Sequence, residues 1–381
     1  MEQKTLGYGI IGTGTYCDHY LGTLGPVYKN VRAIGCSDLN TEAAKAAAAR
    51  WNVPKVYTTE EMLADPEVDI VLIITNPASH YSLTMQALKA GKHVFCEKPL
   101  TPSLEQANEI VAFAAEKGLF VGAAPDTFLS PEFQTVRKLL DEGAIGKVIS
   151  VTANYVGPGA DLWHPNAGYL YKKGVGPALD MGPYFLTTLV SILGPLESLF
   201  CYANRGWDVR RIRDQDVEVE ALTNYCGVLR FADGVVGNIN MSFDEWKTNQ
   251  PAMEIYGTEG VLIAPDPNTM MGPIRLLKAE DFKKLVNSKG DNMGARLAAI
   301  YGPESMELFT EIETIAPRIG NQRGAGVADM ARAILEGGKP RVSAELCRHV
   351  TEAINAFDIS AQTGLPYRMT TTFEKPKMMV F

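Results

Sequence analysis

The first third of the chain alternates short apolar runs with helix-like stretches, and this alternation restricts the fold more than any other feature. Strand-like runs lie at residues 8–12, 31–37, 70–75, 93–96 and 119–123, with helix-like stretches at 41–51, 79–90 and 103–117. Ser79 and Ser103 stand where helix N-caps belong, and Gly91 and Gly118 follow the ends of their helices. Such alternation predicts a parallel sheet with helices on both faces.

The pattern changes near residue 126. Strand-like runs now dominate, at 147–155, 218–231, 235–243 and 253–256, and helix-like stretches lie at 131–142, 326–336 and 344–363. Short turns separate several of these runs, which indicates a largely antiparallel sheet. A chain of 381 residues is too long for one core of the usual size. We therefore expect an α/β protein of two domains, a doubly wound parallel one at 1–126 and an α+β one at 127–381.

Composition excludes several classes of protein. The chain has 36 Lys and Arg against 44 Asp and Glu, a formal charge of −8, and no basic runs. This argues against nucleic acid or an anionic membrane as the main partner. No apolar stretch reaches the roughly 18 residues of a membrane helix, and the first apolar run ends in glycines, so it predicts a strand and not a signal peptide. Six scattered cysteines without a C-x-x-C pair predict reduced thiols in a cytoplasmic protein, and we expect no metal.

A glycine turn directly follows the first strand-like run. The expected cofactor loop consists of Gly12, Thr13, Gly14, Thr15 and Tyr16. Glycine allows the backbone angles of the turn and a close approach to a pyrophosphate, and the following helix supplies free N–H groups. The third small position of G-x-G-x-x-G is Cys17, a weaker but still small residue. Within a β-α-β unit, the turn predicts a dinucleotide site.

Asp38 ends the second strand-like run. A carboxylate at this place accepts hydrogen bonds from the adenosine ribose, and it would repel a 2′-phosphate. No Arg or Lys follows immediately, so we expect NAD rather than NADP as the cofactor. The alternative for Asp38 is a turn or helix-cap residue.

The tripeptide Glu97-Lys98-Pro99 follows the fifth strand-like run, at the carboxyl end of the predicted sheet where ligands bind in such folds. Oxidation of an alcohol requires removal of the hydroxyl proton as hydride leaves carbon. A lysine assists if desolvation or nearby positive charge lowers its pKa. A surface Lys-Pro turn is the alternative interpretation.

Together with the Gly12/Gly14 turn and the segment Thr75-Asn76-Pro77…His80, this tripeptide resembles the Gfo/Idh/MocA family, which includes glucose–fructose oxidoreductase and inositol dehydrogenases. The resemblance covers nearly the whole chain. It implies a Rossmann domain followed by a domain with a large open, mostly antiparallel sheet, and nicotinamide and substrate that meet between them. It further implies a catalytic Lys98, a Lys98–Pro99 bond that is often cis, His80 near the nicotinamide, and a homo-oligomer, dimer or tetramer, built through the open sheet face.

A second stretch, Gly174 to Tyr184, resembles the family's glycine-rich segment that leads to D-x-G-x-H. Asp180 matches the acidic position, but Tyr184 stands where the family usually has a catalytic His. Because an unperturbed phenol has a pKa of about 10, three alternatives remain. Tyr184 acts as an acid/base beside Lys98, or it only binds substrate, or another histidine takes over.

His164 is the best candidate for that histidine, and it lies in an aromatic stretch within the long irregular segment 157–176. Aromatic faces stack on pyranose rings, so we expect a substrate site there. Its further candidate residues are Asp126, Tyr155 and Trp163, with Asp161, Asn166, Tyr169 and Tyr171 nearby. Arg323, before a late helix, either approaches a polar ligand or serves an oligomer contact or helix cap.

The sequence therefore predicts an NAD-dependent dehydrogenase that oxidises a secondary hydroxyl of a sugar, cyclitol or glycoside to a ketone. Lys98 is the expected acid/base, with Asp180, Tyr184 and His164 completing the catalytic set. Two rivals stay open: a redox-neutral NAD-dependent glycosidase, and a non-catalytic NAD-binding regulator. The joint presence of Lys98 and Asp180 argues against the regulator.

Overall fold

The computed structural model describes residues 4–164, 166–318 and 323–379, which fall into two compact units. Unit 1 comprises the described residues of 1–129, 319–355 and 370–377, and unit 2 those of 130–318, 356–369 and 378–381. The first division lies within three residues of the predicted boundary at 126. The remaining division differs from the predicted domain 127–381, because two late segments, 319–355 and 370–377, group with unit 1. Within unit 1 the thiol of Cys347, for example, accepts the N–H of Ala123 at 3.2 Å.

Unit 1 is built on a six-stranded sheet of order β3-β2-β1-β4-β5-β6, in which every neighbouring pair is parallel. Its strands are β1 (Leu6–Ile11), β2 (Val31–Ser37), β3 (Lys55–Val56), β4 (Ile70–Ile73), β5 (His93–Cys96) and β6 (Val121–Ala123). Every residue of β1 and β4 is buried, as expected for strands covered on both faces. The order reverses between β1 and β4, and ligands of such sheets bind at this switch point.

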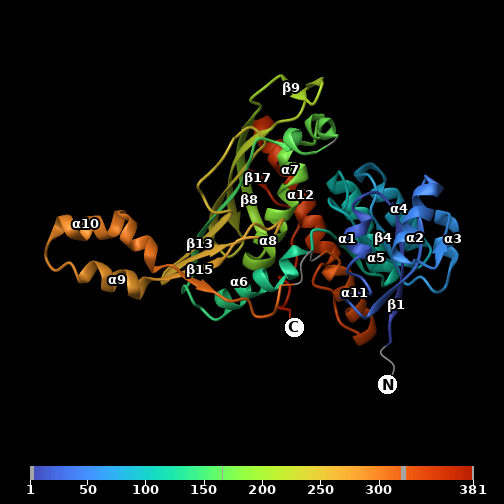
Figure 1. Ribbon diagram of the computed structural model, residues 1–381, viewed down its shortest axis with the longest axis horizontal. Coiled ribbons are helices and arrows are strands. Elements are labelled where there is room, and N and C mark those ends of the chain that lie inside the picture. The colour runs from blue at the N-terminus through green and yellow to red at the C-terminus, as the bar shows by residue number, and fades with distance from the viewer. Residues whose placement is uncertain (1–3, 165, 319–322, 380–381) are drawn as a thin grey trace. The chain divides into compact units, whose positions relative to one another are not determined.

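The helices of unit 1 follow the strands in the predicted alternation (Figure 1). They are α1 (Cys17–Leu21), α2 (Thr41–Trp51), α3 (Thr59–Ala64), α4 (Pro77–Lys89), α5 (Leu104–Lys117), η1 (Thr127–Leu129), α11 (Ala325–Glu336) and the first part of α12 (Ala344–Thr363). Ser103 caps α5 as predicted, and Gly118 ends it in the left-handed region. The predicted cap at Ser79 is wrong. Asn76 caps α4 instead, because Pro77, which has no N–H, fits the first helical position.

Unit 2 carries a nine-stranded sheet of order β16-β15-β14-β13-β7-β12-β11-β8-β17, antiparallel except between β7 and β12. The strands are β7 (Val148–Val156), β8 (Leu196–Asn204), β11 (Asn224–Phe231), β12 (Val236–Ser242), β13 (Met253–Gly257), β14 (Gly260–Ala264), β15 (Ile274–Lys278), β16 (Thr310–Ile312) and β17 (Tyr367–Arg368). The mostly antiparallel sheet is confirmed. The predicted run 218–231 is divided, since β10 (Gln215–Glu218) pairs separately with β9 (Val209–Ile212) as a hairpin.

One helix of unit 2, α8 (Gly182–Leu193), is buried along its entire length. Its Phe185 packs against Tyr155 of β7 with ring centroids 6.1 Å apart. The other helices are α6 (Pro131–Asp141), α7 (Gly176–Asp180), α9 (Ala279–Asn287), α10 (Met293–Tyr301), η2 (Ala160–Leu162), η3 (Ala167–Tyr171) and η4 (Pro303–Leu308). Helices α9 and α10, which the sequence patterns did not reveal, form an arm that projects from the strands of the unit (Figure 1). In the described part of the chain no helix has the length and apolarity needed to span a membrane.

Candidate active site

The glycine turn of unit 1 leaves strand β1 as the sequence predicts. Gly12 has φ +98°, and a Cβ there would lie 2.1 Å from the carbonyl oxygen of Ile74. Only glycine fits so close to the neighbouring strand end. Gly14, by contrast, has no atom within 4 Å of the place of a Cβ. Gly14, Thr15 and Tyr16 are exposed, so no side chain of the described residues fills the space beside Gly14, and the buried Cys17 begins α1.

Asp38 holds this turn from the end of β2. Its Oδ2 accepts the N–H of Thr13 at 2.7 Å and the Thr13 hydroxyl at 3.0 Å, and its Oδ1 accepts the N–H of Asn40 at 2.8 Å. Burial raises the pKa of Asp38, but these three hydrogen bonds outweigh it, so the pKa lies below its usual value. The carboxylate therefore stays charged near neutral pH. A carboxylate has about four acceptor positions, which leaves capacity for a ribose hydroxyl.

The segment from Thr75 to His80 links two loops at the carboxyl edge of the sheet. The Thr75 hydroxyl lies 2.7 Å from that of Ser79 on α4. His80 is fully buried, with Nδ1 2.8 Å from the carbonyl oxygen of Pro99 and Nε2 3.1 Å from that of Thr75. Burial lowers the pKa of His80, so the ring is neutral and donates one hydrogen bond, which we assign to the shorter contact with Pro99. His80 thus orients the Lys98-Pro99 segment.

Glu97, Lys98 and Pro99 follow β5 directly, and the Lys98–Pro99 bond is cis, as the resemblance implied. Glu97 is buried and accepts the backbone N–H of Lys98 at 3.0 Å through Oε2. Its Oε1 accepts the hydroxyl of Tyr20 at 2.6 Å. The buried carboxylate of Glu97 therefore holds the backbone of the half-buried Lys98. The sequence analysis did not identify Tyr20 as a site residue. The only feature that could have indicated it is a tyrosine on the first helix, eight residues after Gly12.

Asp126, which the sequence predicts to bind substrate, lies beside the start of α11. It is fully buried, and its Oδ2 accepts the N–H groups of Gly324 at 3.0 Å and Gly326 at 2.8 Å. This carboxylate holds the start of α11. The substrate role of Asp126 stays a prediction. The Arg323 guanidinium lies 6.0 Å from the ring of Tyr16, which places it beside the cofactor turn.

In unit 2, Asp180 ends α7 and Tyr184 lies in the first turn of α8, where it is buried. Tyr155, on β7, lies close to Asp180. Burial raises the pKa of Tyr155, and the negative charges of Asp180 and Asp266 raise it further. Tyr155 therefore keeps its proton near neutral pH and is able to donate a hydrogen bond. Three predicted residues, Asp180, Tyr184 and Tyr155, are thus carried by neighbouring elements of one unit.

His164 lies between two aromatic side chains in the segment 157–176. Its ring centroid is 5.4 Å from that of Trp163 and 5.7 Å from that of Tyr169, both edge-on. Its Nδ1 accepts the N–H of Asn166 at 3.0 Å. A neutral imidazole has one lone pair available, so we assign its proton to Nε2. With this assignment Nε2–H of His164 is a hydrogen-bond donor.

A buried arginine that the sequence analysis did not identify holds the segment 157–176. Arg210 of β9 pairs with Asp161 at 2.7 Å and with Asp244 at 2.8 Å, and all three side chains are almost completely buried. The same guanidinium donates to the carbonyl oxygens of Pro158 at 2.8 Å and Phe243 at 2.6 Å. No local signal could have revealed it, because its partners lie 33 to 52 residues away in the chain.

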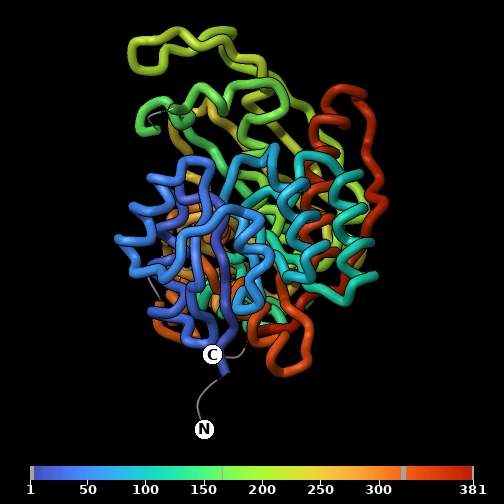
Figure 2. The backbone as a smooth tube through the Cα atoms, turned by 90° about the vertical axis from the view of Figure 1, so that its right-hand side faces the viewer, coloured from blue at the N-terminus to red at the C-terminus, as the bar shows by residue number. Residues whose placement is uncertain are grey.

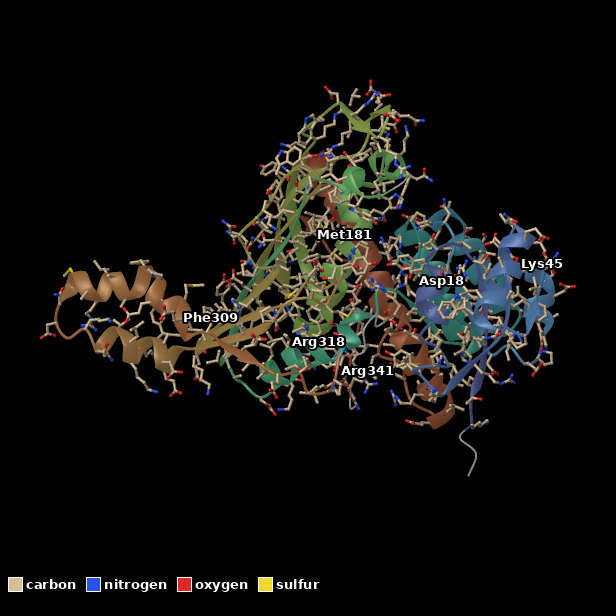
Figure 3. All side chains as sticks on the ribbon, viewed as in Figure 1. Asp18, Lys45, Met181, Phe309, Arg318 and Arg341 are labelled. Atoms are coloured by element: carbon tan, nitrogen blue, oxygen red, sulfur yellow. The ribbon has the colours of Figure 1, made fainter. Side chains whose placement is uncertain are left out.

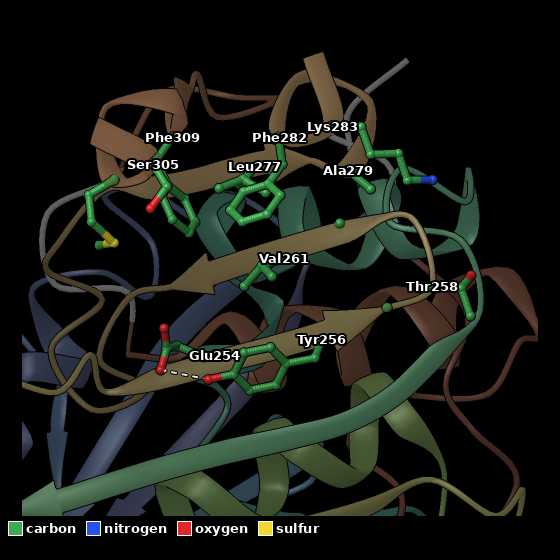
Figure 4. Close-up of a pocket in the computed structure, with 13 residues that line it drawn as sticks. Glu254, Tyr256, Thr258, Val261, Leu277, Ala279, Phe282, Lys283, Ser305 and Phe309 are labelled. Atoms are coloured by element: carbon green, nitrogen blue, oxygen red, sulfur yellow. Dashed lines mark hydrogen bonds between the residues drawn. The ribbon is translucent and has the colours of Figure 1, made fainter. Parts of the chain in front are cut away.

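A cavity of about 380 Å³ lies elsewhere in unit 2 (Figure 4). Strands β13–β15, α9 and η4 line it with mostly apolar side chains, and the Tyr256 hydroxyl donates to Glu254 across its floor at 2.9 Å. None of the predicted site residues is among the described residues that line it. Nor do the described residues include a group of three or more His, Cys, Asp or Glu side chains placed to hold a metal ion.

The sequence matches two models of one protein family. Residues 6–124 match the oxidoreductase family GFO/IDH/MocA with an NAD-binding Rossmann fold, and residues 133–263 match the GFO/IDH/MocA C-terminal domain. The chain belongs to the Gfo/Idh/MocA family. It is accordingly an oxidoreductase with an NAD(P)-binding Rossmann domain, and the resemblance stated from the sequence is confirmed.

Individual relatives act on different hydroxylated compounds. The chain is 29% identical over 77% of its length to 1,5-anhydro-D-fructose reductase of Ensifer adhaerens, of which it covers 86%. It is 31% identical over 67% of its length to trans-1,2-dihydrobenzene-1,2-diol dehydrogenase of Mus musculus, of which it covers 73%. Levoglucosan dehydrogenase in complex with NADH and levoglucosan shares the fold, with a TM-score of 0.77 over 97% of this chain and 100% of that one at 20% identity.

Proposed function

We propose that this family member oxidises a secondary hydroxyl of a sugar, cyclitol or glycoside to a ketone, with NAD as the hydride acceptor, and that the reaction is reversible. The anchoring of Lys98 carries the proposal: Glu97 binds its backbone, and His80 binds the carbonyl of Pro99. The names of the reductase and the levoglucosan dehydrogenase support a carbohydrate-like substrate.

Lys98 takes the central role in proton transfer. In the oxidation, the neutral amine accepts the hydroxyl proton while the C–H hydride leaves carbon, and in the reduction the ammonium returns the proton. Asp180 and the hydroxyl of Tyr155 orient the substrate hydroxyls, and Tyr184 donates to a substrate oxygen. The Nε2–H donor assigned to His164 supports a binding role for this residue, and we assign the role of proton acceptor to Lys98.

The cofactor fits the glycine turn of unit 1. Bound NAD would supply the carbon that accepts the hydride. Gly12, Thr13, Gly14, Thr15 and Tyr16 would hold the pyrophosphate, and Asp38 the ribose. Thr75, Asn76 and Pro77 would lie against the nicotinamide end, where His80 and Glu97 position Lys98. The charged Asp38 carboxylate favours NAD over NADP, because it repels a 2′-phosphate. We further propose that the enzyme is a homo-oligomer.

Replacement of Lys98 by Ala tests the assignment. We expect kcat to fall by a factor of at least about 10², because a positioned acid/base contributes about 10²–10⁴. NADH affinity, measured by fluorescence titration, should change little, and Lys117→Ala on the exposed surface of α5 is the control. The assay follows NADH absorbance with a panel of sugars, cyclitols and glycosides. Unchanged turnover in the variant would refute the role of Lys98.

If no compound of the panel gives an NADH signal, two further observations distinguish the alternative functions. Glycoside cleavage without NADH accumulation would identify a redox-neutral glycosidase, an alternative that Tyr184 in place of the usual family His keeps open. NAD binding without activity on any compound would indicate a regulator.

A further inference from the structure

Three rings stand on the surface of the segment 157–176. Trp163 is 73% exposed and Tyr169 54% exposed, and the half-buried His164 lies edge-on between them. We call these three residues the aromatic platform. Folding normally buries large aromatic surface, so exposed rings gathered in one place mark a binding surface.

The platform is held rigidly by the rest of unit 2. The N–H groups of Trp163 and His164 both donate to the carbonyl oxygen of Ala160, at 3.1 and 2.8 Å. Asp161, in the same turn, is fixed by the buried Arg210 at 2.7 Å and by the hydroxyl of Tyr171. The β9–β10 hairpin packs over η2 and η3 at this end of the unit (Figure 2). These contacts hold the backbone of residues 160–164, so little backbone entropy is lost there when the rings bind a ligand.

The chemistry of the platform fits one class of ligand. Two aromatic rings offer apolar surface, and Nε2–H of His164 offers a hydrogen-bond donor between them, since Nδ1 is engaged by Asn166. A pyranose ring has an apolar C–H face and hydroxyl acceptors at its rim. A purely apolar partner would leave the donor unsatisfied, which costs free energy when it is buried.

The platform and the proposed catalytic residues of unit 2 are carried by consecutive elements of the chain. Helix α7 follows η3 along the chain and packs against it, and it carries Asp180 at its end, next to Met181 (Figure 3). Hydride transfer is favoured where water is excluded. In unit 2 Tyr184 is buried, so the proposed function places the reacting ring on its side. The platform is open to solvent, so it suits a part of the substrate that does not react.

We propose that the aromatic platform is a subsite for a second ring, and that the enzyme prefers glycosides over free monosaccharides. The second ring stacks on Trp163 and Tyr169, and His164 donates to one of its hydroxyls. This inference rests on the proposed function. Binding energy from such a remote ring supports turnover of the reacting ring, because it contributes to orientation.

The test compares matched substrates in one enzyme. The monosaccharide with the strongest NADH signal in the panel is assayed beside its phenyl glycoside and its disaccharide. Trp163→Ala should lower kcat/KM for the two glycosides roughly tenfold, because the second ring loses one of its two stacking surfaces. The monosaccharide should change less than about twofold. Trp163→Phe should restore most of the loss, and Tyr301→Ala, on α10 and 82% exposed, should affect neither substrate.

Each alternative outcome contradicts a different statement. Equal losses on monosaccharide and glycosides would place Trp163 at the reacting ring and overturn the subsite. No change in kinetics, with a change in sedimentation of Trp163→Ala, would assign the platform to a protein partner and also overturn it. If wild-type enzyme oxidises no compound of the panel, the proposed function fails, and the inference fails with it.

Discussion

In unit 1 the candidate cofactor site is formed largely by backbone, whereas in unit 2 the candidate substrate site is formed by side chains on a segment of irregular structure. Gly12 has no room for a side chain, and the Thr13 N–H is fixed by Asp38. In unit 2, the buried Arg210 joins η2, β9 and the end of β12 through ion pairs, and the rings of the platform face solvent. A cofactor common to many relatives requires one fixed geometry, while loops on a rigid scaffold can change specificity without changing the fold.

Among the variants considered, removal of the Arg210 charge should lower the unfolding free energy most. Arg210→Met leaves Asp161 and Asp244 buried without their partner, so we expect a loss of about 3–5 kcal/mol in unfolding free energy. The neighbouring Arg211→Met is the control, because Arg211 and its partner Asp216 are both exposed and should contribute less than about 1 kcal/mol. Denaturant unfolding measures both. Equal small losses would show that the segment 157–176 does not depend on the buried pairs.

Acid should affect unit 1 through His349 of α12. Burial lowers the pKa of this fully buried side chain to about 4, against 6.5 ordinarily. Between these values the unfolded chain binds a proton that the folded chain does not, so stability falls as pH falls from 6.5 to 4. The loss at pH 4 should reach about 3 kcal/mol. Hydrogen exchange should locate it in unit 1, and His349→Gln should flatten the profile. A steeper profile in the variant would contradict the assignment.

Substitution of the two glycines of the turn should affect stability at one position and NADH binding at the other. Gly12→Ala should lower the unfolding free energy by about 2 kcal/mol, because its φ is positive and the added Cβ meets Ile74. Gly14→Ala meets no atom and should leave stability unchanged, yet weaken NADH binding where the pyrophosphate needs the space. Calorimetry and fluorescence titration measure the two effects. If both variants bound NADH as tightly as the wild type, the cofactor would not lie on this turn.

The smallest expected effect concerns the choice of cofactor. Asp38→Asn removes the charge but keeps an oxygen that accepts from Thr13. The ratio of kcat/KM for NAD to that for NADP should fall about tenfold, equivalent to about 1.4 kcal/mol. Side-by-side kinetics with the two cofactors give this ratio directly. A wild-type enzyme that favours NADP would refute the role of Asp38.

Local patterns in the sequence determined most of unit 1. The glycine turn, Asp38 and the tripeptide at 97–99 each follow a strand of the parallel sheet, so their grouping at one edge follows from the alternation itself. The parallel sheet and the cap at Ser103 were predicted correctly for the same reason. The cap at Ser79 was not, since Asn76 before Pro77 is the stronger start signal.

Tertiary structure alone decided the rest. Asp126 is a buried acceptor for α11 because two glycines nearly 200 residues later present their N–H groups to it. The donor state of His164 depends on a single hydrogen bond, and the rigid hold on its segment depends on Arg210, whose partners come from distant parts of the chain. Burial and hydrogen bonding between distant residues leave no periodicity in the sequence, so only the folded chain reveals them.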